Sequence, residues 1–473
     1  MRGWGGCRWG GVTRLLRAIP TRWAAALLLV VVVGPLVQIA TAQPLVRFAQ
    51  TAALVEEGSL RLDSYAPTLL VDQVEHDGHV YSDKAPLEAF LAVPVYAVGR
   101  AVGMESASVE RPEGNLGLWW VTLWMSTLPA AALLVLMAGA ARRVAAAGSD
   151  LAAGALAFGT LLLPFAGELY GHVLCTVLAY GAWRLIDERR NRAGPLLAAG
   201  ALVGASVATE YPMALVAAIL AVAVVVLSGW RALPWFLAGG APFGIFVAWY
   251  HWAAFGDPLT DPYRLKPVHA GASAAVTGAP RPGQAVEVLF GSRGLLLFAP
   301  VVLVGLVGLV RQARRGGPAR AGAVVGLATF VALWLLQAGW SNPWGGEMPG
   351  PRYMIAALPF LAPGVAEVAL RARALVRVAT AWGVAAMALP LLTVHLVLGD
   401  GTTVVAHLDN LRRWGFAPPV SVVALGDAGW VVYGLVILGA LMLLVRSLGH
   451  ADDAAPETDE AAPTSPALAS ELV

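Results

Sequence analysis

Long apolar runs separated by short polar segments make up most of this sequence. Twelve of the runs approach or reach the roughly 18 to 25 residues that a helix needs to cross a bilayer. The pattern predicts an all-α polytopic membrane protein with about 12 transmembrane helices, within a range of about 11 to 13. The predicted spans are 22–43, 116–139, 151–166, 171–186, 196–208, 213–229, 234–252, 294–311, 320–338, 353–370, 374–396 and 429–446.

Composition leads to the same class. Of the 473 residues, 58% are hydrophobic and 13% are charged, and the mean hydropathy is +0.68. A soluble domain carries about a quarter charged residues, so a soluble globular protein is excluded. The two cysteines, Cys7 and Cys175, lie in a basic segment and an apolar run, which leaves no disulfide framework or cysteine metal cluster. We expect no nucleic-acid partner.

Charged residues divide between the two sides of the predicted spans. With the N-terminus inside, 20 of the 32 Lys and Arg residues fall on inside segments, whereas 20 of the 30 Asp and Glu residues fall outside. Cytoplasmic loops of membrane proteins carry an excess of Lys and Arg. The sequence therefore predicts a multi-pass protein of the plasma membrane with both termini in the cytoplasm.

The chain divides into one membrane-embedded domain, 1–446, and an acidic, Ala- and Pro-rich cytoplasmic tail, 447–473, which we expect to be disordered. Ala40-Thr41-Ala42 resembles a signal-peptide cleavage site. The preceding apolar run is longer than the usual 7 to 15 residues of a signal peptide, so we favour a retained anchor. The long segment 44–115 is the first extracytoplasmic loop. Within it, 87–98 is apolar but too short to span, which predicts a juxtamembrane helix.

The stretch before that helix combines charges that suit phosphate chemistry. Lys84 can pair with a phosphate at the bilayer surface. Four nearby carboxylates offer a general base for activating a hydroxyl: Asp63, Asp72, Asp77 and Asp83. The alternative interpretation is an ordinary surface loop whose charged side chains only interact with solvent.

Other ionisable residues lie at the outer ends of predicted spans. Glu168, Tyr170 and His172 lie between two spans, and Glu210 and Tyr211 lie at another turn on the same side. Ionisable groups at membrane depth usually face a polar cavity. Both turns could instead lie in water, with the tyrosines at the interface.

Two further outer loops are candidates for a substrate cavity. The first carries Asp257 and Tyr263 among prolines, and the second places Arg352 where a Gly- and Pro-rich turn enters the next span. An arginine can clamp a phosphate bidentately. Trp340 and Trp344, in the second loop, could stack on a sugar or anchor at the interface.

Two short motifs in the sequence resemble those of a known family. Arg47-Phe48-Ala49 is similar to an R-Y-A stretch, and YSDKAPL at 81–87 is similar to a Y-x-x-K-P-P-L segment, with Ala85 in place of the first proline. Both occur in membrane glycosyltransferases of the GT-C fold that use polyprenyl-phosphate sugars, near the protein mannosyltransferases and aminoarabinose transferases. The stretches FGDPL, GSRGLLLFAP and GPRYMIAALPF also resemble bacterial members of this group.

The resemblance implies about a dozen helices with a cavity under the first outer loop. It implies an enzyme that transfers a hexose or pentose, with inversion, from a polyprenyl-phosphate lipid to an acceptor hydroxyl on the extracytoplasmic face, as part of cell-envelope chemistry. The acceptor would be a glycan, a lipid or a protein. The cavity would hold Tyr81 and Asp83 together with the outer-face residues above, and Lys84 and Arg352 would hold the donor phosphate.

The sequence departs from the family at one position that matters. Related enzymes carry an Asp-Glu pair just before R-Y-A, whereas this chain has Pro44 and Leu45. Asp63 or Asp72 would then supply the base, and we favour Asp63 slightly because related enzymes take their acid close after the first span. No cofactor is required by any motif, although a divalent cation could bridge one of these aspartates to the phosphate. Two alternatives remain open: a twelve-span transporter or flippase, and a non-catalytic GT-C-like subunit.

Overall fold

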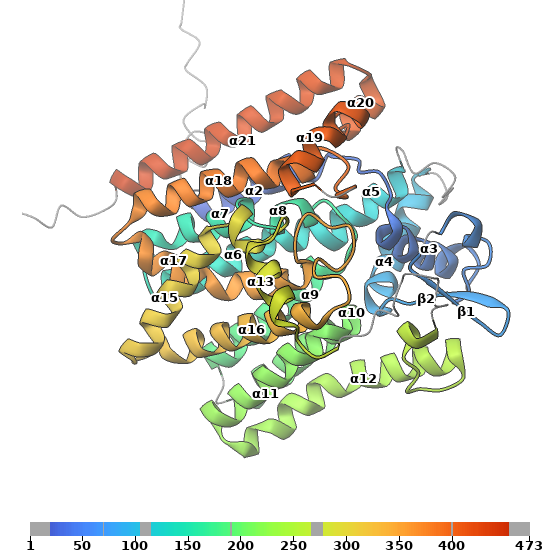
Figure 1. Cartoon of the computed structure of the whole chain (residues 1–473), viewed down its shortest axis with the longest axis horizontal. Helices are drawn as coiled ribbons and strands as arrows, with labels where there is room; N and C mark the ends of the chain where they lie inside the picture. The colour runs from blue at the N-terminus through green and yellow to red at the C-terminus, as the bar shows by residue number, and fades with distance from the viewer. Residues whose placement is uncertain are drawn as a thin grey trace, which may run out of the picture.

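The computed structural model describes residues 19–69, 71–104, 115–189, 192–265, 278–398 and 401–453, apart from the side chains of 449–453. These residues form a bundle of roughly parallel and antiparallel helices with shorter elements gathered at one end (Figure 1). The helices are α2 (Thr21–Val33), α3 (Ala42–Glu56), α4 (Leu87–Ala101), α5 (Leu116–Thr122), α6 (Leu128–Arg142), α7 (Ser149–Phe158), α8 (Leu162–Phe165), α9 (His172–Arg189), α10 (Ala193–Thr209), α11 (Ala214–Ser228), α12 (Leu233–Phe255), α13 (Pro282–Phe290), α14 (Leu295–Phe298), α15 (Val301–Arg315), α16 (Arg320–Gly339), α17 (Ala362–Ala369), α18 (Arg373–Leu392), α19 (Thr403–Trp414), α20 (Val420–Leu425) and α21 (Ala428–Asp453).

A polytopic helical membrane protein is confirmed, but not the number of spans. Six helical segments of the described chain are long and apolar enough to cross a membrane, or seven if one pair bent by 96° counts as a span. The six are Leu116–Arg142, Tyr211–Ser228, Trp230–Phe255, Arg320–Gly339, Arg373–Leu392 and Ala428–Leu448. Several other predicted spans are shorter apolar helices, such as Ala193–Thr209, packed inside the bundle.

Two predicted spans differ from regular α-helices for reasons visible in the sequence. The run 22–43 is helical only as far as Val33, because Gly34 and Pro35 follow and the chain then extends to α3. The run 353–370 begins as a 3-10 helix, η7 (Arg352–Leu361), and becomes α-helical only in α17. Pro359 lies inside η7, where it cannot donate a backbone hydrogen bond.

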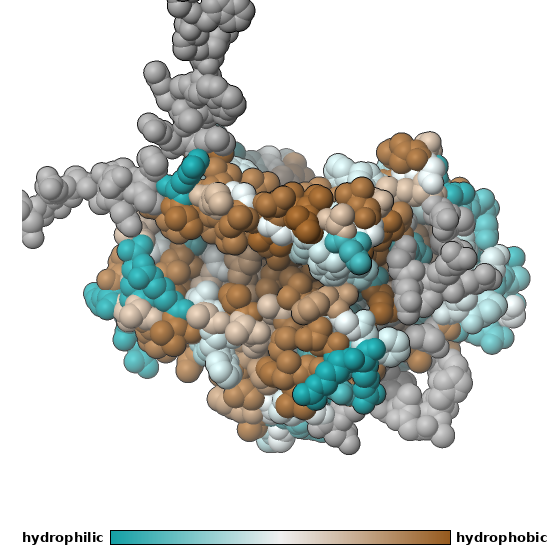
Figure 2. Space-filling model, turned by 90° about the horizontal axis from the view of Figure 1, so that it is seen from above, coloured by the Kyte–Doolittle hydropathy of each residue, from teal (hydrophilic) through white to brown (hydrophobic). Residues whose placement is uncertain are grey.

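The outer surface of the bundle is apolar where a bilayer would contact it. Figure 2 shows one face, on which hydrophobic side chains cover the middle and hydrophilic ones lie toward the margins. Val431 and Leu435 on α21 and Val378 on α18 each expose more than 60% of their area. A contiguous apolar surface of this kind would aggregate in water, so it is expected to face lipid.

The described residues of 44–104 fold into a compact cap at one end of the bundle, beside the end of α12 (Figure 1). α3 and α4 pack on each other, and between them the strands β1 (Gln73–His76) and β2 (His79–Ser82) form an antiparallel hairpin. α4 covers the stretch predicted as a juxtamembrane helix. At the other end of the chain α21 continues to Asp453, and the remainder of the expected tail lies outside the described residues.

Candidate functional site

A buried arginine joins the cap to the bundle. Arg47 on α3 has a side chain only 1% exposed, and its Nη1 lies 2.9 Å from Oε2 of Glu88 on α4. Its Nη2 pairs with Oε1 of Glu210, which directly follows α10. Burial raises the pKa of Glu88 to about 7 in spite of the charge of Arg47. Two carboxylates thus compensate this buried cation.

Gly171, at the start of α9, allows this ion-pair group to form. Its φ is +72°, which is disfavoured for residues with a side chain. A Cβ at this position would lie 2.9 Å from Oε1 of Glu210 and 3.1 Å from Cζ of Arg47. Glycine is therefore needed both for the backbone turn and for the close approach of Arg47.

Lys84 lies between two aspartates at the junction of β2 and α4. Its Nζ is 2.9 Å from Oδ1 of Asp72 and 3.2 Å from Oδ1 of Asp83. Burial on its own would lower the pKa of Lys84, but Asp72 and Asp83 outweigh it and the pKa is raised. Asp72, with a side chain 17% exposed, is the more accessible of the two carboxylates. The lysine is held charged, and each aspartate is held next to it.

Arg352, at the start of η7, has a different environment. Its Nη1 donates to Oε1 of Gln43 at 2.8 Å, and its guanidinium lies over the rings of Tyr170 (5.7 Å) and Tyr353 (5.4 Å). No carboxylate of the described chain lies within 4 Å of it, and its buried Nε has no hydrogen-bond partner there. Asp72 interacts with it only at longer range. Arg352 is thus a buried cation with donors left for an anion.

Aromatic rings surround these cations. The ring of Tyr263 lies 5.8 Å from Nζ of Lys84, and it also lies edge-on to Tyr211 and to Trp340, each at 6.4 Å. Trp340 in turn lies 4.9 Å from Tyr353, which lies beneath Arg352. These four residues, Tyr211, Tyr263, Trp340 and Tyr353, form an aromatic wall that connects Lys84 to Arg352.

His172 lies at the same place from the side of α9. Its Nδ1 is 3.8 Å from Oε1 of Glu210, and its ring stacks on Tyr170 and meets Tyr353 edge-on. The charges of Arg352, Arg47 and Lys84 all act on it. These contacts place His172 and Glu210 beside the predicted phosphate ligands.

The structure therefore brings together most of the residues that the sequence singled out. The residues that share this site are Asp72, Asp83, Lys84, His172, Glu210, Tyr211, Tyr263 and Arg352. They come from the first loop, three helix ends and two later loops. They meet where the cap contacts the bundle, through the pairs Arg47–Glu210 and Gln43–Arg352.

Asp63 is not among them. Its Oδ1 accepts a hydrogen bond from the backbone N–H of Val80 at 2.7 Å, and its Oδ2 lies 2.8 Å from Nδ1 of His79. The Val80 N–H and then His79 hold the pKa of Asp63 below its ordinary value. The side chain is 45% exposed beside the hairpin. Asp63 fastens the segment after α3 to β2, and contacts β2 instead of Lys84.

Four other predicted cavity residues lie outside the group of cations. Glu168 is buried against His395, 2.9 Å from its Nδ1. Tyr81 packs on Phe255 behind the hairpin. Asp257 forms a turn after α12 by accepting the N–H of Leu259, and the ring of Trp344 lies against Gly291.

Several site residues were missed or left without a role by the sequence analysis. Glu88 carries the clearest signal that was overlooked, because it is a carboxylate within an apolar helix and such residues are rare without a partner. Gln43 and Tyr353 have no comparable signal, since neutral residues of these types occur at any membrane boundary. Their roles depend on contacts between segments that are far apart in sequence.

The expected divalent cation has no evident ligand set in the described chain. No group of three or more His, Cys, Asp or Glu side chains there is placed to hold a metal ion. Asp72 and Asp83 hold the ammonium group of Lys84 between them instead. A metal requirement therefore remains a prediction that only an assay can test.

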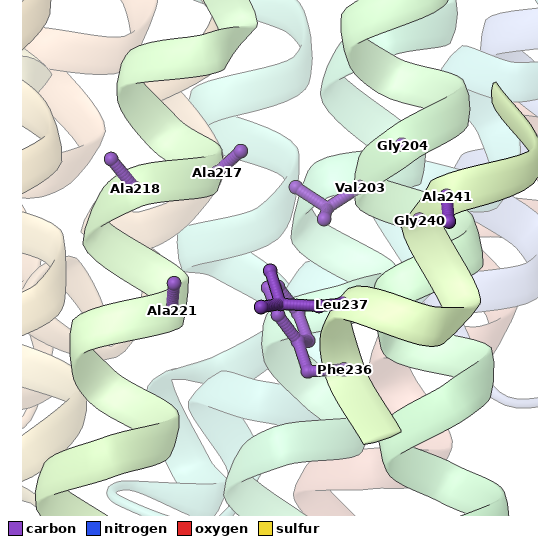
Figure 3. A pocket seen from close by; sticks show the side chains of 9 residues that line it. All are labelled: Val203, Gly204, Ala217, Ala218, Ala221, Phe236, Leu237, Gly240 and Ala241. Atoms are coloured by element: carbon purple, nitrogen blue, oxygen red, sulfur yellow. The ribbon is translucent and has the colours of Figure 1, made fainter. Parts of the chain in front are cut away.

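An apolar groove runs along α10 and α11, the two helices that Glu210 and Tyr211 connect, and along α12. It has a volume of about 390 Å³ and lies between α10, α11 and α12 (Figure 3). Small residues line two of its sides, with Gly204 on α10 and Ala217 on α11, and the side chain of Leu237 reaches between them from α12 (Figure 3). Its lining consists of Val203, Gly204, Ala217, Ala218, Ala221, Phe236, Leu237, Gly240 and Ala241.

Comparisons with known proteins place this geometry in a structural class. No protein-family model and no curated protein sequence matches the chain. Among solved structures, ArnT from Cupriavidus metallidurans in the apo state is similar with a TM-score of 0.51 and 16% identity, over 93% of this chain and 75% of that one. The chain has the GT-C fold. The resemblance inferred from R-F-A and YSDKAPL is confirmed at that level.

Two further solved structures are similar at lower scores. ArnT of the same organism bound to undecaprenyl phosphate gives a TM-score of 0.47 at 18% identity, over 94% of this chain and 79% of that one. The Archaeoglobus fulgidus oligosaccharyltransferase in the apo form gives 0.47 at 13% identity, over 87% of this chain and 59% of that one. At these identities the similarity concerns the fold.

Proposed function

We propose that this protein is an integral-membrane glycosyltransferase that moves a sugar from a polyprenyl-phosphate donor to an acceptor hydroxyl, with inversion. The GT-C fold is compatible with this chemistry but does not specify it, because one fold can host several functions. The proposal therefore depends on the site. The acceptor would be a glycan, a lipid or a protein.

Arg352 is the observation that carries the proposal. A buried cation without a carboxylate partner is costly, and such groups are normally compensated. Gln43 and the rings of two tyrosines hold the guanidinium of Arg352 in place, and its Nε has no hydrogen-bond partner in the described chain. A lipid phosphate at the membrane surface would supply the missing negative charge and accept two parallel hydrogen bonds. Lys84 would assist from the other end of the aromatic wall.

The reaction then needs one base. The acceptor oxygen attacks the anomeric carbon, the bond from that carbon to the phosphate oxygen breaks, and the electron pair leaves with the phosphate on Arg352. The proton of the acceptor hydroxyl passes to a carboxylate. We assign this role to Asp72, because it lies beside Lys84 and within electrostatic range of Arg352, whereas Asp63 serves the hairpin.

The apolar groove is a suitable path for the hydrocarbon chain of the donor. Gly204 lies six residues before Glu210 on one helix, which is roughly 9 Å along its axis. The groove therefore begins about two turns below the polar site, within helices that expose much of their surface to lipid. A phosphate on Arg352 and a chain in the groove would match one amphipathic lipid.

The site is proposed to face the outside of the cell. The distribution of Lys and Arg places the first loop, Asp72 and Lys84 outside, with both termini in the cytoplasm. This arrangement would let the enzyme use lipid-linked sugars on the extracytoplasmic leaflet of the plasma membrane.

Purified protein assayed with a panel of polyprenyl-phosphate sugars would test the proposal. We expect transfer with at least one donor, and release of polyprenyl phosphate. Arg352→Ala should abolish transfer and weaken binding of polyprenyl phosphate itself. Binding of that lipid with parental affinity by Arg352→Ala would reject the phosphate site. Tight binding by the parent without transfer to any acceptor would favour the non-catalytic subunit.

A further inference from the structure

Helix α19 has the reverse of the side-chain distribution expected for a helix on a water-soluble surface. Thr403, His407 and Asn410 are polar, yet they are buried against the bundle. Val405 and Leu408 are apolar, yet they expose 60% and 41% of their area. A buried polar group and an exposed apolar patch are the two observations that most need an explanation. Together they indicate that α19 has an apolar neighbour outside the protein.

Hydrogen bonds on the buried side fix how α19 is turned. Oγ1 of Thr403 donates to the carbonyl of Pro349 at 2.7 Å. Nδ2 of Asn410 lies 2.8 Å from the carbonyl oxygen of Val394 and 2.7 Å from that of Leu396. Rotation of the helix to bury its apolar side chains would leave these buried polar groups without partners, which is costly. The apolar side chains therefore stay directed outward.

The outward side of α19 is itself divided into two flanks, because residues three or four positions apart share one side of a helix. The apolar flank consists of Val404, Val405, Leu408 and Leu411. The polar flank consists of Thr402, Asp409 and Arg413. Nη2 of Arg413 lies 2.7 Å from Oδ2 of Asp409, so the polar flank carries an exposed ion pair. Arg412 follows Leu408 by one turn, and an arginine there can keep its stem on the apolar side and its guanidinium at the surface. One flank thus suits hydrocarbon and the other suits water.

The neighbours of α19 place it at a membrane surface. It follows the end of α18, on which it packs, and it precedes the start of α21, and both of these helices are long and apolar enough to span a membrane. Phe416, two residues after α19, lies against Trp430 at the start of α21, with ring centroids 6.5 Å apart. Aromatic residues gather at such a boundary. α19 has 12 residues. A helix of that length extends about 18 Å, which is too short to cross a bilayer.

We propose that α19 lies in the lipid–water interface, with the apolar flank at the acyl-chain boundary and the polar flank in water. The occupant of the exposed apolar surface is then phospholipid, because this surface continues the lipid-facing surface of α18 and α21. The bond from Thr403 to Pro349 also ties α19 to the loop that leads into Arg352, so the helix would hold that loop at the membrane surface. This inference is independent of the proposed function, since it assumes no substrate.

Spin labels on single cysteines test the placement of the two flanks. Val405→Cys and Asp409→Cys are made in a chain with Cys7 and Cys175 replaced by serine, and the labelled full-length protein is reconstituted in bilayers of phosphatidylcholine and phosphatidylglycerol. Collisions with oxygen report exposure to lipid, and collisions with a water-soluble nickel chelate report exposure to water. The ratio of oxygen to nickel accessibility should exceed one at 405 and fall below one at 409. Leu408→Cys should give the same result as Val405→Cys, and it replaces that variant if the latter does not fold.

Two results would overturn the proposal. A ratio below one at both 405 and 408 would show that the apolar flank lies in water. Low accessibility to both reagents at these positions would show that protein covers the flank, either a second copy of this chain or another subunit. Neither measurement uses a sugar donor, so rejection of the proposed glycosyltransferase activity would leave this test unaffected.

Discussion

Arg352 donates a hydrogen bond to the side-chain oxygen of Gln43 across 2.8 Å, and so joins two residues that are 309 positions apart in the chain. The same amide of Gln43 donates from Nε2 to the carbonyl of Tyr170 at 3.2 Å. The amide therefore holds Arg352 in place without neutralising it. This relationship is what leaves the guanidinium available for an anion.

Replacing the amide by a carboxylate should occupy Arg352 from within the protein. Gln43→Glu keeps the shape of the side chain and adds a charge that pairs with the guanidinium. We expect polyprenyl-phosphate affinity to fall by about 1.5 to 3 kcal/mol, the range for charge-assisted hydrogen bonds. Gln50→Glu adds the same charge to α3 beside Tyr250, and should affect affinity much less. Equal losses in both variants would contradict a specific role for Gln43.

Substitution of Asp72 and substitution of Asp63 should have different effects on turnover. Asp72→Asn retains shape but removes basicity, so turnover should fall by roughly 10²- to 10⁴-fold while donor binding is largely kept. Asp63→Asn should leave turnover near that of the parent, because this residue contacts Val80 and His79. Steady-state rates and donor-binding isotherms for both variants decide the matter. A larger loss of turnover for Asp63→Asn would reverse the assignment.

Gly171→Ala should destabilise the protein more than Gly58→Ala. Both glycines have a positive φ, but only at Gly171 would the added Cβ also meet other side chains. Gly58 has a φ of +62°, and no atom lies within 4 Å of the position that a Cβ would take there, so Gly58→Ala should cost only about 1 to 2 kcal/mol. At Gly171 the added carbon also meets Glu210 and Arg47. We expect thermal melting in detergent to show a clearly lower midpoint for Gly171→Ala. Similar midpoints for the two variants would show that the ion-pair group adapts.

The pH dependence of stability should contain a contribution from Glu88. Its pKa in the folded protein is raised to about 7, above the ordinary value of 4.5. A raised folded-state pKa means that protonation stabilises the fold, so this contribution is complete below about pH 4.5 and is lost as the pH rises through 7. The melting temperature should therefore fall between pH 5 and 8, and it should fall less in Glu88→Gln. Parallel curves would rule out titration of Glu88 in this range.

The proposed orientation can be checked in whole cells. Single cysteines at Ser64 and Ser341, in a chain with Cys7 and Cys175 replaced by serine, should react with a membrane-impermeant thiol reagent. A cysteine at Ser465, outside the described residues, should react only after lysis, because the positive-inside pattern places the C-terminus in the cytoplasm. Labelling at Ser465 in intact cells would overturn the orientation and the outer location of the site.

The amino-acid sequence was enough to predict the class of the protein and most of the residues that meet at the candidate site. Apolar runs cannot be buried in a soluble domain of this size, so hydropathy predicted a helical membrane protein. Lys84 and Arg352 could be singled out because a charged residue beside an apolar run is energetically costly, and such residues commonly belong to functional sites. Short local signals, such as the apolar stretch after Lys84, were enough to predict α4.

The folded structure was needed to show which of the predicted residues contact one another. The sequence offered both Asp63 and Asp72 as the base and slightly favoured Asp63, yet Asp63 fastens the hairpin and Asp72 lies against Lys84. Gln43 and Tyr353 gained a role only through their contacts with Arg352. Such contacts form between segments that are far apart in the sequence, so the hydropathy of either segment does not predict them. The predicted number of spans was not confirmed for a related reason, because apolar helices that pack among other helices can be shorter than a bilayer is thick.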